Sequence, residues 1–368
     1  MPGKARNLFP GGNTCEGFYS FYDYTIEPDA TRIFIIKGGP GVGKSTFMRH
    51  IGNEMLERSY DVEFHCCSSD NGSIDGVVIP AIRVALLDGT APHVVDPKNP
   101  GAVDEIIHLG DHWNEEKMVA NKVAILDINY KVGRMFKIAY SALKEGKVAL
   151  DEWESYIIES MEFNKVNKIT RELLTEIFSK VTPQFDKFPK DRHMFGSAIT
   201  PNGLVNEYEA ILQDCSKLYL IKGSPGTGKS TLIETIFKTA QRYGLDTEVF
   251  HCAFDPRKLD ALYIPHLQIG VLNVSPPIKF DASKIDSNPK IIDLDQHVNL
   301  KIMSTYETEI KNADKRFWAS IHRAVDYINK AKKLHDDMEK YYIPAMDFDA
   351  INARREETLQ RILNYANK

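Results

Sequence analysis

A glycine-rich sequence that could hold a polyphosphate occurs twice in the chain. In each copy two glycines frame four residues and are followed by Lys, Ser and Thr, after an apolar run and before a stretch of helical character. The glycines let the loop curl so that backbone N–H groups point at an anion, and the next helix adds its positive end. The residues expected to contact the phosphates are Gly38, Gly39, Pro40, Gly41, Val42, Gly43, Lys44, Ser45 and Thr46 in the first copy, and Gly223, Ser224, Pro225, Gly226, Thr227, Gly228, Lys229, Ser230 and Thr231 in the second.

The Lys and Ser residues of the two loops have separate expected roles. Lys44 and Lys229 would reach the β and γ phosphates of a nucleoside triphosphate, and the hydroxyls of Ser45 and Ser230 would hold Mg²⁺. The sequence therefore predicts two sites for a Mg²⁺-nucleotide, with ATP as the expected nucleotide.

An acid at the end of a neighbouring strand would complete such a site by orienting Mg²⁺ or its water. Asp88 has this position, because it follows four apolar residues and precedes Gly89-Thr90. The matching residue of the second copy is Asn273, which is neutral and a poorer partner for Mg²⁺. We therefore expect Asp88 to be a catalytic and metal-associated carboxylate, and the second site to bind nucleotide without efficient turnover. The alternative for Asp88 is a simple turn residue.

Other acids and histidines near the predicted strands are weaker candidates. Asp70, with Asp255 as its counterpart, could face the phosphates as a base or as an outer Mg²⁺ group, whereas Asp75 and Asp260 could simply cap an element. His93, beside Asp88, could contact substrate. The adjacent pairs His65-Cys66 and His251-Cys252 are expected to pack in strands, because neighbouring strand residues point to opposite faces and cannot chelate one metal together.

The sequence around the two loops is also duplicated. Gly38 and Gly223 lie 185 residues apart, and nearly the same offset relates matching residues from the N-terminal region to the last helical stretches. The predicted division is a first unit over 1–190, with an α/β core over about 1–113 and a helical arm over about 114–188. The second unit covers 191–368, with a core over about 191–298 and an arm over about 299–367.

The predicted fold class is α/β, with a parallel sheet flanked by helices in each unit. Strands are expected over 32–36, 61–66 and 83–87, and a helix over 44–58, because apolar runs separated by a helical crossover are typical of a sheet covered on both faces. Each arm is almost free of Gly and Pro, which predicts a long helical hairpin, broken near Gly146 in the first arm and near Lys330 in the second. Pro344 should bend or restart the second arm.

The helical arms could serve in two ways. Their apolar stripes could simply bury against each other, or the arms could form a lid or a docking site for a protein partner. Arg134 and Arg316 could project onto a γ-phosphate, although a surface position is the commoner outcome for a helical arginine.

Composition is that of an ordinary globular protein, with 43% hydrophobic residues, 26% charged residues and a formal net charge of −5. This balance gives no strong indication of a nucleic-acid partner. The five cysteines contain no CxxC spacing, and no apolar run approaches the length of a membrane span or a secretory signal. A cytoplasmic location and no membrane partner are therefore expected.

The two loops resemble those of P-loop NTPases, including AAA-type ATPases and small nucleotide kinases, and the whole chain resembles uncharacterised bacterial ATP-binding proteins with two tandem P-loop units. This resemblance implies tandem duplicated P-loop NTPase domains and an ATP-binding function. The arginine-rich sensor of AAA proteins and the LSGGQ signature of ABC proteins are both missing from the sequence.

Three functions are consistent with these residues. The favoured one is a nucleoside-triphosphatase with Lys44, Ser45 and Asp88 at its main site. The second is a kinase for a nucleoside, nucleotide or other small molecule, with Asp70 as the base. The third is a non-catalytic switch in which ATP repositions the helical arms for a protein partner.

Overall fold

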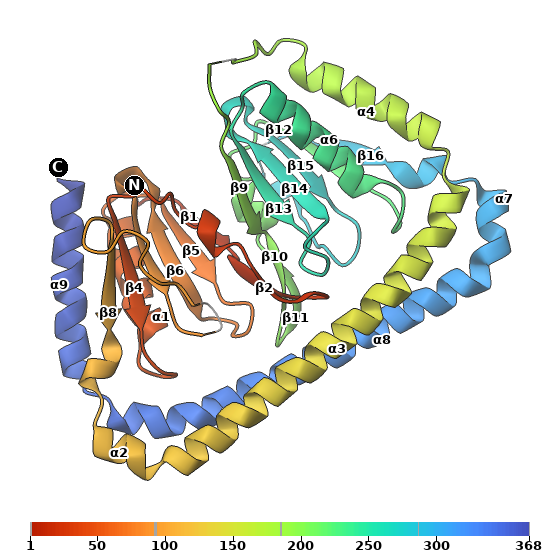
Figure 1. The fold of residues 1–368 in the computed structure, drawn as a ribbon. Helices are drawn as coiled ribbons and strands as arrows, with labels where there is room; N and C mark the ends of the chain where they lie inside the picture. The colour runs from red at the N-terminus through yellow and green to blue at the C-terminus, as the bar shows by residue number, and fades with distance from the viewer. Residues whose placement is uncertain (1, 92–93, 185, 286, 368) are drawn as a thin grey trace.

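The computed structural model describes residues 2–91, 94–184, 186–285 and 287–367, which form two α/β units connected by long helices (Figure 1). Each unit contains a mixed sheet of six strands. The strand order is β1-β5-β6-β7-β4-β8 in the first unit and β16-β12-β15-β14-β13-β9 in the second. Read from its other end, the second order matches the first strand for strand, so the duplication in the sequence is also a duplication of topology.

The strands and helices have the following bounds. The strands of the first unit are β1 (Ala5–Leu8), β2 (Gly11–Thr14), β3 (Gly17–Ser20), β4 (Arg32–Lys37), β5 (Val62–Cys66), β6 (Ile74–Ile79), β7 (Val84–Asp88) and β8 (Asp104–His108). Those of the second are β9 (Asp191–Phe195), β10 (Ser197–Thr200), β11 (Gly203–Asn206), β12 (Lys217–Lys222), β13 (Thr247–His251), β14 (Leu259–Ile264), β15 (Ile269–Asn273) and β16 (Lys290–Asp293). The α-helices are α1 (Lys44–Glu57), α2 (Glu115–Ala120), α3 (Lys122–Ser160), α4 (Phe163–Phe178), α5 (Tyr208–Ile211), α6 (Lys229–Arg242), α7 (Leu300–Met303), α8 (Glu307–Tyr342) and α9 (Phe348–Ala366).

The α/β class and the elements predicted around the first loop are confirmed. The strands expected over 32–36, 61–66 and 83–87 are β4, β5 and β7, and the helix expected over 44–58 is α1. The apolar residues of β4 and β7 are buried because these central strands are covered on both faces. Helix α1 buries one face, including Phe47, Ile51 and Met55, against the sheet.

The predicted parallel sheets are confirmed only in part, because both sheets are mixed, although mostly parallel. Strand β6 pairs antiparallel with both β5 and β7, and β14 pairs in the same way with β13 and β15. The connections on either side of β6, residues 67–73 and 80–83, are short. Short connections of this kind suit antiparallel neighbours, whereas parallel neighbours require a longer crossover. The sequence reading overlooked β6 and therefore assigned a single direction to the whole sheet.

The prediction of a helical hairpin in each arm is wrong. Helix α3 runs through Gly146 without a break, and α8 runs through Lys330. These two long helices lie antiparallel against each other (Figure 1), as the pairs Glu145–Arg323 and Glu152–Arg316 show. Breaks occur instead at Met161 and around Pro344. The break expected at Pro344 is confirmed, and the first arm has one at the matching place without a proline.

Gly146 marks a close approach and not a break. A methyl group there would lie 3.3 Å from the Cβ of Ser320 on α8 and 3.5 Å from the ring of Phe254. The faces in contact also carry small residues such as Ala142 and Ala324, both fully buried. Small side chains let the helix backbones approach, and the buried apolar residues of α3 lie between Ala139 and Ile157.

The last helix of each arm packs on the other unit. In α4, Val166, Leu173 and Ile177 are buried in the core of the second sheet. In α9, Ile351, Leu359 and Ile362 are buried in the core of the first sheet. Figure 1 shows the result, with α9 beside β4 and β8 and α4 beside α6. The ranges 1–190 and 191–368 thus each contain one sheet, and each sheet is covered in part by a helix from the other range.

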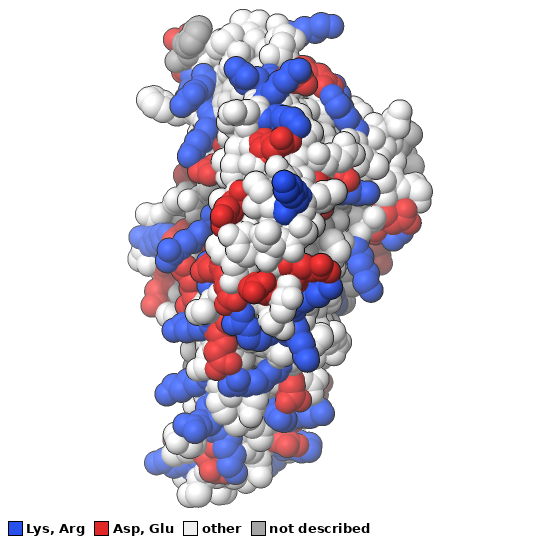
Figure 2. All heavy atoms as spheres, turned by 90° about the vertical axis from the view of Figure 1, so that its right-hand side faces the viewer, with Lys and Arg blue, Asp and Glu red and all other residues white. Residues whose placement is uncertain are grey.

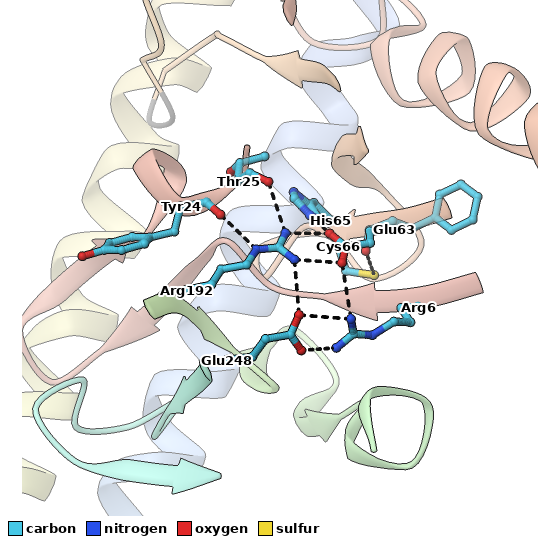
Figure 3. A network of polar contacts seen from close by, with 9 residues as sticks. Arg6, Tyr24, Thr25, Glu63, His65, Cys66, Arg192 and Glu248 are labelled. Carbon is cyan, nitrogen blue, oxygen red and sulfur yellow. Dashed lines mark hydrogen bonds and ion pairs between the residues drawn. The ribbon is translucent and has the colours of Figure 1, made fainter. Parts of the chain in front are cut away.

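Crossed ion pairs join the edges of the two units (Figure 3). Arg6 binds Glu248 through both carboxylate oxygens, at 3.2 and 2.5 Å, and Arg192 binds Glu63 in the same way, at 2.8 and 2.6 Å. Burial opposes the ionisation of Glu63, but the Arg192 guanidinium holds the pKa of that carboxyl well below its usual range. Arg6 matches Arg192 in the duplication, and Glu63 matches Glu248. Each unit therefore supplies one arginine and one glutamate to the network.

Charges of both signs are interspersed on the face of the molecule shown in Figure 2. In the described part of the chain, no helix combines the length and the apolar character needed to cross a membrane. These observations agree with the balanced composition.

Candidate functional site

The first loop, residues 38–46, connects β4 to the start of α1. Gly43 takes a φ of 89° immediately before the helix, a conformation that favours glycine. It caps α1 without a side chain, and the first turn of the helix carries no acidic residue. The first N–H groups of α1 and the positive end of its dipole are thus directed at the space an anion would occupy. Lys44 lies over the loop, its Nζ donating to the carbonyls of Gly38 at 2.9 Å and Gly39 at 2.8 Å.

The second loop, residues 223–231, repeats this geometry between β12 and α6. Gly228 has a φ of 93° and caps α6 without a side chain. Lys229 Nζ donates to the carbonyls of Gly223 at 2.6 Å and Ser224 at 2.7 Å. Burial lowers the pKa of Lys229 to about 8. The carboxylate of Asp295 also lies at this loop, where its Oδ1 accepts a hydrogen bond from the N–H of Ser224 at 2.8 Å.

The predicted metal-binding serines are both anchored to the antiparallel strand that the sequence reading overlooked. Ser45 Oγ accepts a hydrogen bond from the N–H of Ile74 at 3.0 Å, at the start of β6. Ser230 Oγ accepts one from the N–H of Leu259 at 2.7 Å, at the start of β14. A second lone pair of each hydroxyl oxygen stays available for a cation. Strand β6 therefore holds Ser45 in place next to the first loop, and β14 holds Ser230 next to the second.

Asp88 lies beside the first loop, as the sequence predicts. Its strand, β7, runs parallel to β4 with Asp88 opposite Ile36. The carboxylate Oδ2 is 3.7 Å from Lys44 Nζ, and Oδ1 accepts a hydrogen bond from the N–H of Thr90 at 2.8 Å. Asp88 therefore forms the turn that the alternative reading proposed and also places a negative charge next to the loop lysine.

Asn273 occupies the same position in the second unit but makes different contacts. Its Oδ1 accepts from the N–H of Ser275 at 3.1 Å, which preserves the turn. Its Nδ2 donates to Oδ1 of Asp260 at 3.0 Å, a contact that requires an amide. Burial raises the pKa of Asp260. The strand-end charge of the first site is therefore absent at Asn273, and the nearest acid to that amide is a buried one.

Asp70 and Asp255 are directed at the long helices. Asp70 lies 3.4 Å from Lys332 Nζ on α8, and Asp255 lies 3.6 Å from Lys147 Nζ on α3. Burial raises the pKa of Asp70. The structure thus places Asp70 in a contact with α8, and no described contact joins it to Lys44 or Asp88.

The other candidates fall outside the loops. Arg316 forms a 2.7 Å ion pair with Glu152 on the exposed side of the helix pair, and Arg134 is exposed on α3. His93 lies outside the described residues. His251 is a partly buried strand residue whose Nδ1 lies 2.5 Å from the carbonyl of Pro256, and burial lowers its pKa to about 4. Within the described residues, no group of three or more His, Cys, Asp or Glu side chains could hold a metal ion.

Sequence reasoning missed the helix ends that cover the loops. A methyl group at Gly39 would lie 2.3 Å from the ring of Tyr342, and one at Gly41 would lie 3.2 Å from Glu339. In the second unit, a methyl group at Gly226 would lie 2.7 Å from the backbone carbonyl of Glu154. Glu154 and Glu339 match at the duplication offset, so their equivalence could be read from the sequence. Their contact with the loop of the opposite unit could not.

A large cavity opens at the second loop. It has a volume of about 950 Å³ and extends from Lys229 and Ser230 to the facing surfaces of α3 and α8. On its rim, Lys258 forms an ion pair with Glu154. This volume is at the upper end of the range for small-molecule sites, about 300 to 1,000 Å³.

Comparisons with known proteins found no matching family model, no similar curated protein and no similar solved structure.

Proposed function

We propose that this chain is a Mg²⁺-dependent ATP-hydrolysing protein in which the first loop carries the turnover and the second binds nucleotide without efficient hydrolysis. The observation that supports this assignment is the strand-end contact at each loop. Asp88 lies 3.7 Å from Lys44 Nζ in the first unit, whereas Asn273 in the second is held against Asp260. At the strand-end position, therefore, the first loop has a carboxylate beside its lysine and the second has an amide, and the acid described at the second loop, Asp295, comes from a different segment.

The residues of the first site have distinct tasks in this proposal. The loop N–H groups and the start of α1 bind the phosphate oxygens, and Lys44 neutralises charge on them. Ser45 and Asp88 would hold Mg²⁺, directly or through water, and the ion supplies charge stabilisation at the transferred phosphate when it is bound. The covering residues Tyr342 and Glu339 would limit the access of water to the loop.

A second candidate function is the ATP-dependent switch. The observation that favours it is that α3 and α8, which pack against each other, end at opposite loops, with Glu154 of α3 at the second and Glu339 of α8 at the first. Nucleotide bound at either loop would therefore act on the same helix pair. A partner that binds the helices only in the presence of ATP, without phosphate release, would favour this function over hydrolysis.

The Lys44→Ala variant is expected to lower the kcat for ATP hydrolysis far more than the Lys229→Ala variant, by about 100-fold against less than about threefold. The reason is that only Lys44 is paired with a strand-end acid. Phosphate release at saturating Mg²⁺-ATP measures the effect. Circular dichroism and melting temperature check that both variants are folded, and equal losses of kcat in the two would contradict the proposed asymmetry.

Binding of ATP at the second loop is expected to weaken about tenfold between pH 7 and pH 9. Lys229 has a pKa of about 8 before binding, so its charge is mostly present at pH 7 and mostly absent at pH 9. A bound anion would raise that pKa, so binding above pH 8 takes up a proton. Calorimetric titration of the Lys44→Ala variant isolates the second loop.

The matched control is the Lys44→Ala, Lys229→Met double variant, in which this pH dependence should disappear. A constant affinity from pH 7 to pH 9 in the single variant would show that Lys229 does not contact the bound phosphates.

A further inference from the structure

The part of the cavity beyond the second loop has an apolar and aromatic wall, which we call the apolar chamber. It lies where β10 and β11 approach the long helices (Figure 1). Its wall consists of Leu150, Trp153 and Ile158 of α3, Phe317, Trp318 and Ile321 of α8, Ile199 and Leu204 of the β10–β11 hairpin, and Phe254. Pockets lined in this way, with a few polar groups at one end, are typical binding sites for small molecules.

The loop end of the cavity is polar and carries charges of both signs, because Glu154, Asp260 and Asp295 line it together with the lysines. Lys229, Ser230 and the backbone of the second loop line the same cavity, and Lys258 lies on its rim. An occupant of the whole cavity would therefore meet phosphate-binding groups at one end and aromatic side chains at the other. An amphiphilic ligand would fit this arrangement if the N–H groups of the loop and Lys229 held a phosphate head.

Three of the wall positions have polar counterparts around the first loop. At the duplication offset, Ser69 replaces Phe254, Asn13 replaces Ile199 and His335 replaces Leu150. Asn13 is fully buried and donates to the carbonyls of Ser68 at 3.3 Å and Ile199 at 3.0 Å. Other wall residues, Leu204, Trp153 and Ile158, have the apolar counterparts Phe18, Met338 and Ile343, so the wall is specific to the second site only in part.

We propose that the second site binds a phosphate ester with a large apolar body, its diphosphate on the second loop and its hydrocarbon or aromatic part in the apolar chamber. The inference rests on the proposed role of the second loop in binding phosphates. The apolar body is the part that adds affinity, because each buried methylene group strengthens binding about fourfold. The amphiphile then competes with nucleotide for the second loop, and the first site is the one that turns over nucleotide.

Farnesyl diphosphate tests the proposal, with inorganic diphosphate and farnesol as its two separate parts. Farnesyl diphosphate should bind at least about 100-fold more tightly than inorganic diphosphate by calorimetric titration. The chain contains three tryptophans, and two of them, Trp153 and Trp318, line the cavity. In a Trp113→Phe variant their fluorescence should change saturably with farnesyl diphosphate.

Two kinds of variant separate the ends of the site. Trp153→Ala and Trp318→Ala, both at partly exposed positions, should each weaken farnesyl diphosphate at least about tenfold and leave inorganic diphosphate unchanged. Lys229→Ala should weaken both diphosphates. The matched control is Trp113→Phe, which lies away from the cavity and should change neither.

Three results would overturn the proposal: equal affinity for the two diphosphates, equal affinity for farnesol and farnesyl diphosphate, or unchanged binding in both chamber variants. If neither diphosphate binds but ATP hydrolysis persists and depends on Lys44, this inference fails and the proposed function stands. If farnesyl diphosphate binds as described but the chain hydrolyses no ATP, the proposed function fails and the chamber assignment stands.

Discussion

The Asp88→Asn variant is expected to hydrolyse ATP at least about 100-fold more slowly than the unmodified chain, with little change in ATP affinity or melting temperature. The substitution keeps the size of the side chain and the Oδ1 atom that accepts the Thr90 N–H, so the turn after β7 is retained. It removes the negative charge 3.7 Å from Lys44 Nζ. A carboxylate that helps a metal ion stabilise the transferred phosphate contributes several kcal/mol, and about 2.7 kcal/mol already corresponds to 100-fold in rate.

The same substitution gives the first unit the residue that the second already has. Asn273→Asp is therefore the matched control and should raise hydrolysis at the second loop, measured in a Lys44→Ala background. The gain should be partial, because a carboxylate at position 273 would lie close to Asp260 without the amide hydrogen bond that now joins them. A rate that survives Asp88→Asn, or a melting temperature that falls along with it, would show that Asp88 is only a turn residue.

Substitution of Ile362 by Asp is expected to unfold the first unit, although residue 362 lies in the second half of the sequence. Ile362 of α9 is fully buried in the first core, where it packs with residues of the first sheet and α1. An unpaired carboxylate at a fully buried position costs several kcal/mol, a large part of the stability of a typical unit. Amide hydrogen exchange should show lost protection in β5, β6 and β7, with β13, β14 and β15 less affected.

Ile177→Asp provides the reciprocal test, because Ile177 of α4 is the residue that matches Ile362 at the duplication offset. It is 5% exposed and lies in the second core. Loss of protection should therefore move to β13, β14 and β15. If each substitution instead destabilised the sheet encoded in its own half of the sequence, the exchange of α4 and α9 would be incorrect.

The elements around the loops could be predicted because their signals are local. Apolar runs such as 33–36, the glycines and the following helical stretch lie within one short segment, and β4 and α1 occur where these signals indicate. Strand β6 was not predicted because short connections join it to β5 and β7, and no helical crossover separates it from them. The direction of a strand is set by the length of its connections, which the apolar pattern does not report.

The site could be predicted in part for the same reason. The difference between Asp88 and Asn273 is visible in the sequence, and so is the duplication that makes it meaningful. The contacts that complete the sites are not visible, because they depend on tertiary packing. Asp260 becomes the partner of Asn273 only when β14 pairs with β15, and Asp70 faces α8 only because that helix returns from the other unit.

The exchange of α4 and α9 has a consequence for how such a chain could have arisen. It is the arrangement of a domain-swapped homodimer, in which each subunit lends its last helix to its partner across a two-fold axis. Joining two such subunits head to tail requires only the short stretch 179–190, because α4 already packs on the sheet that contains β9. Fusion then frees the two copies to diverge, since a change such as Asp to Asn at one loop no longer appears at both. An ancestral symmetric dimer would have been obliged to keep two identical sites, whereas the joined chain can keep one for chemistry and adapt the other.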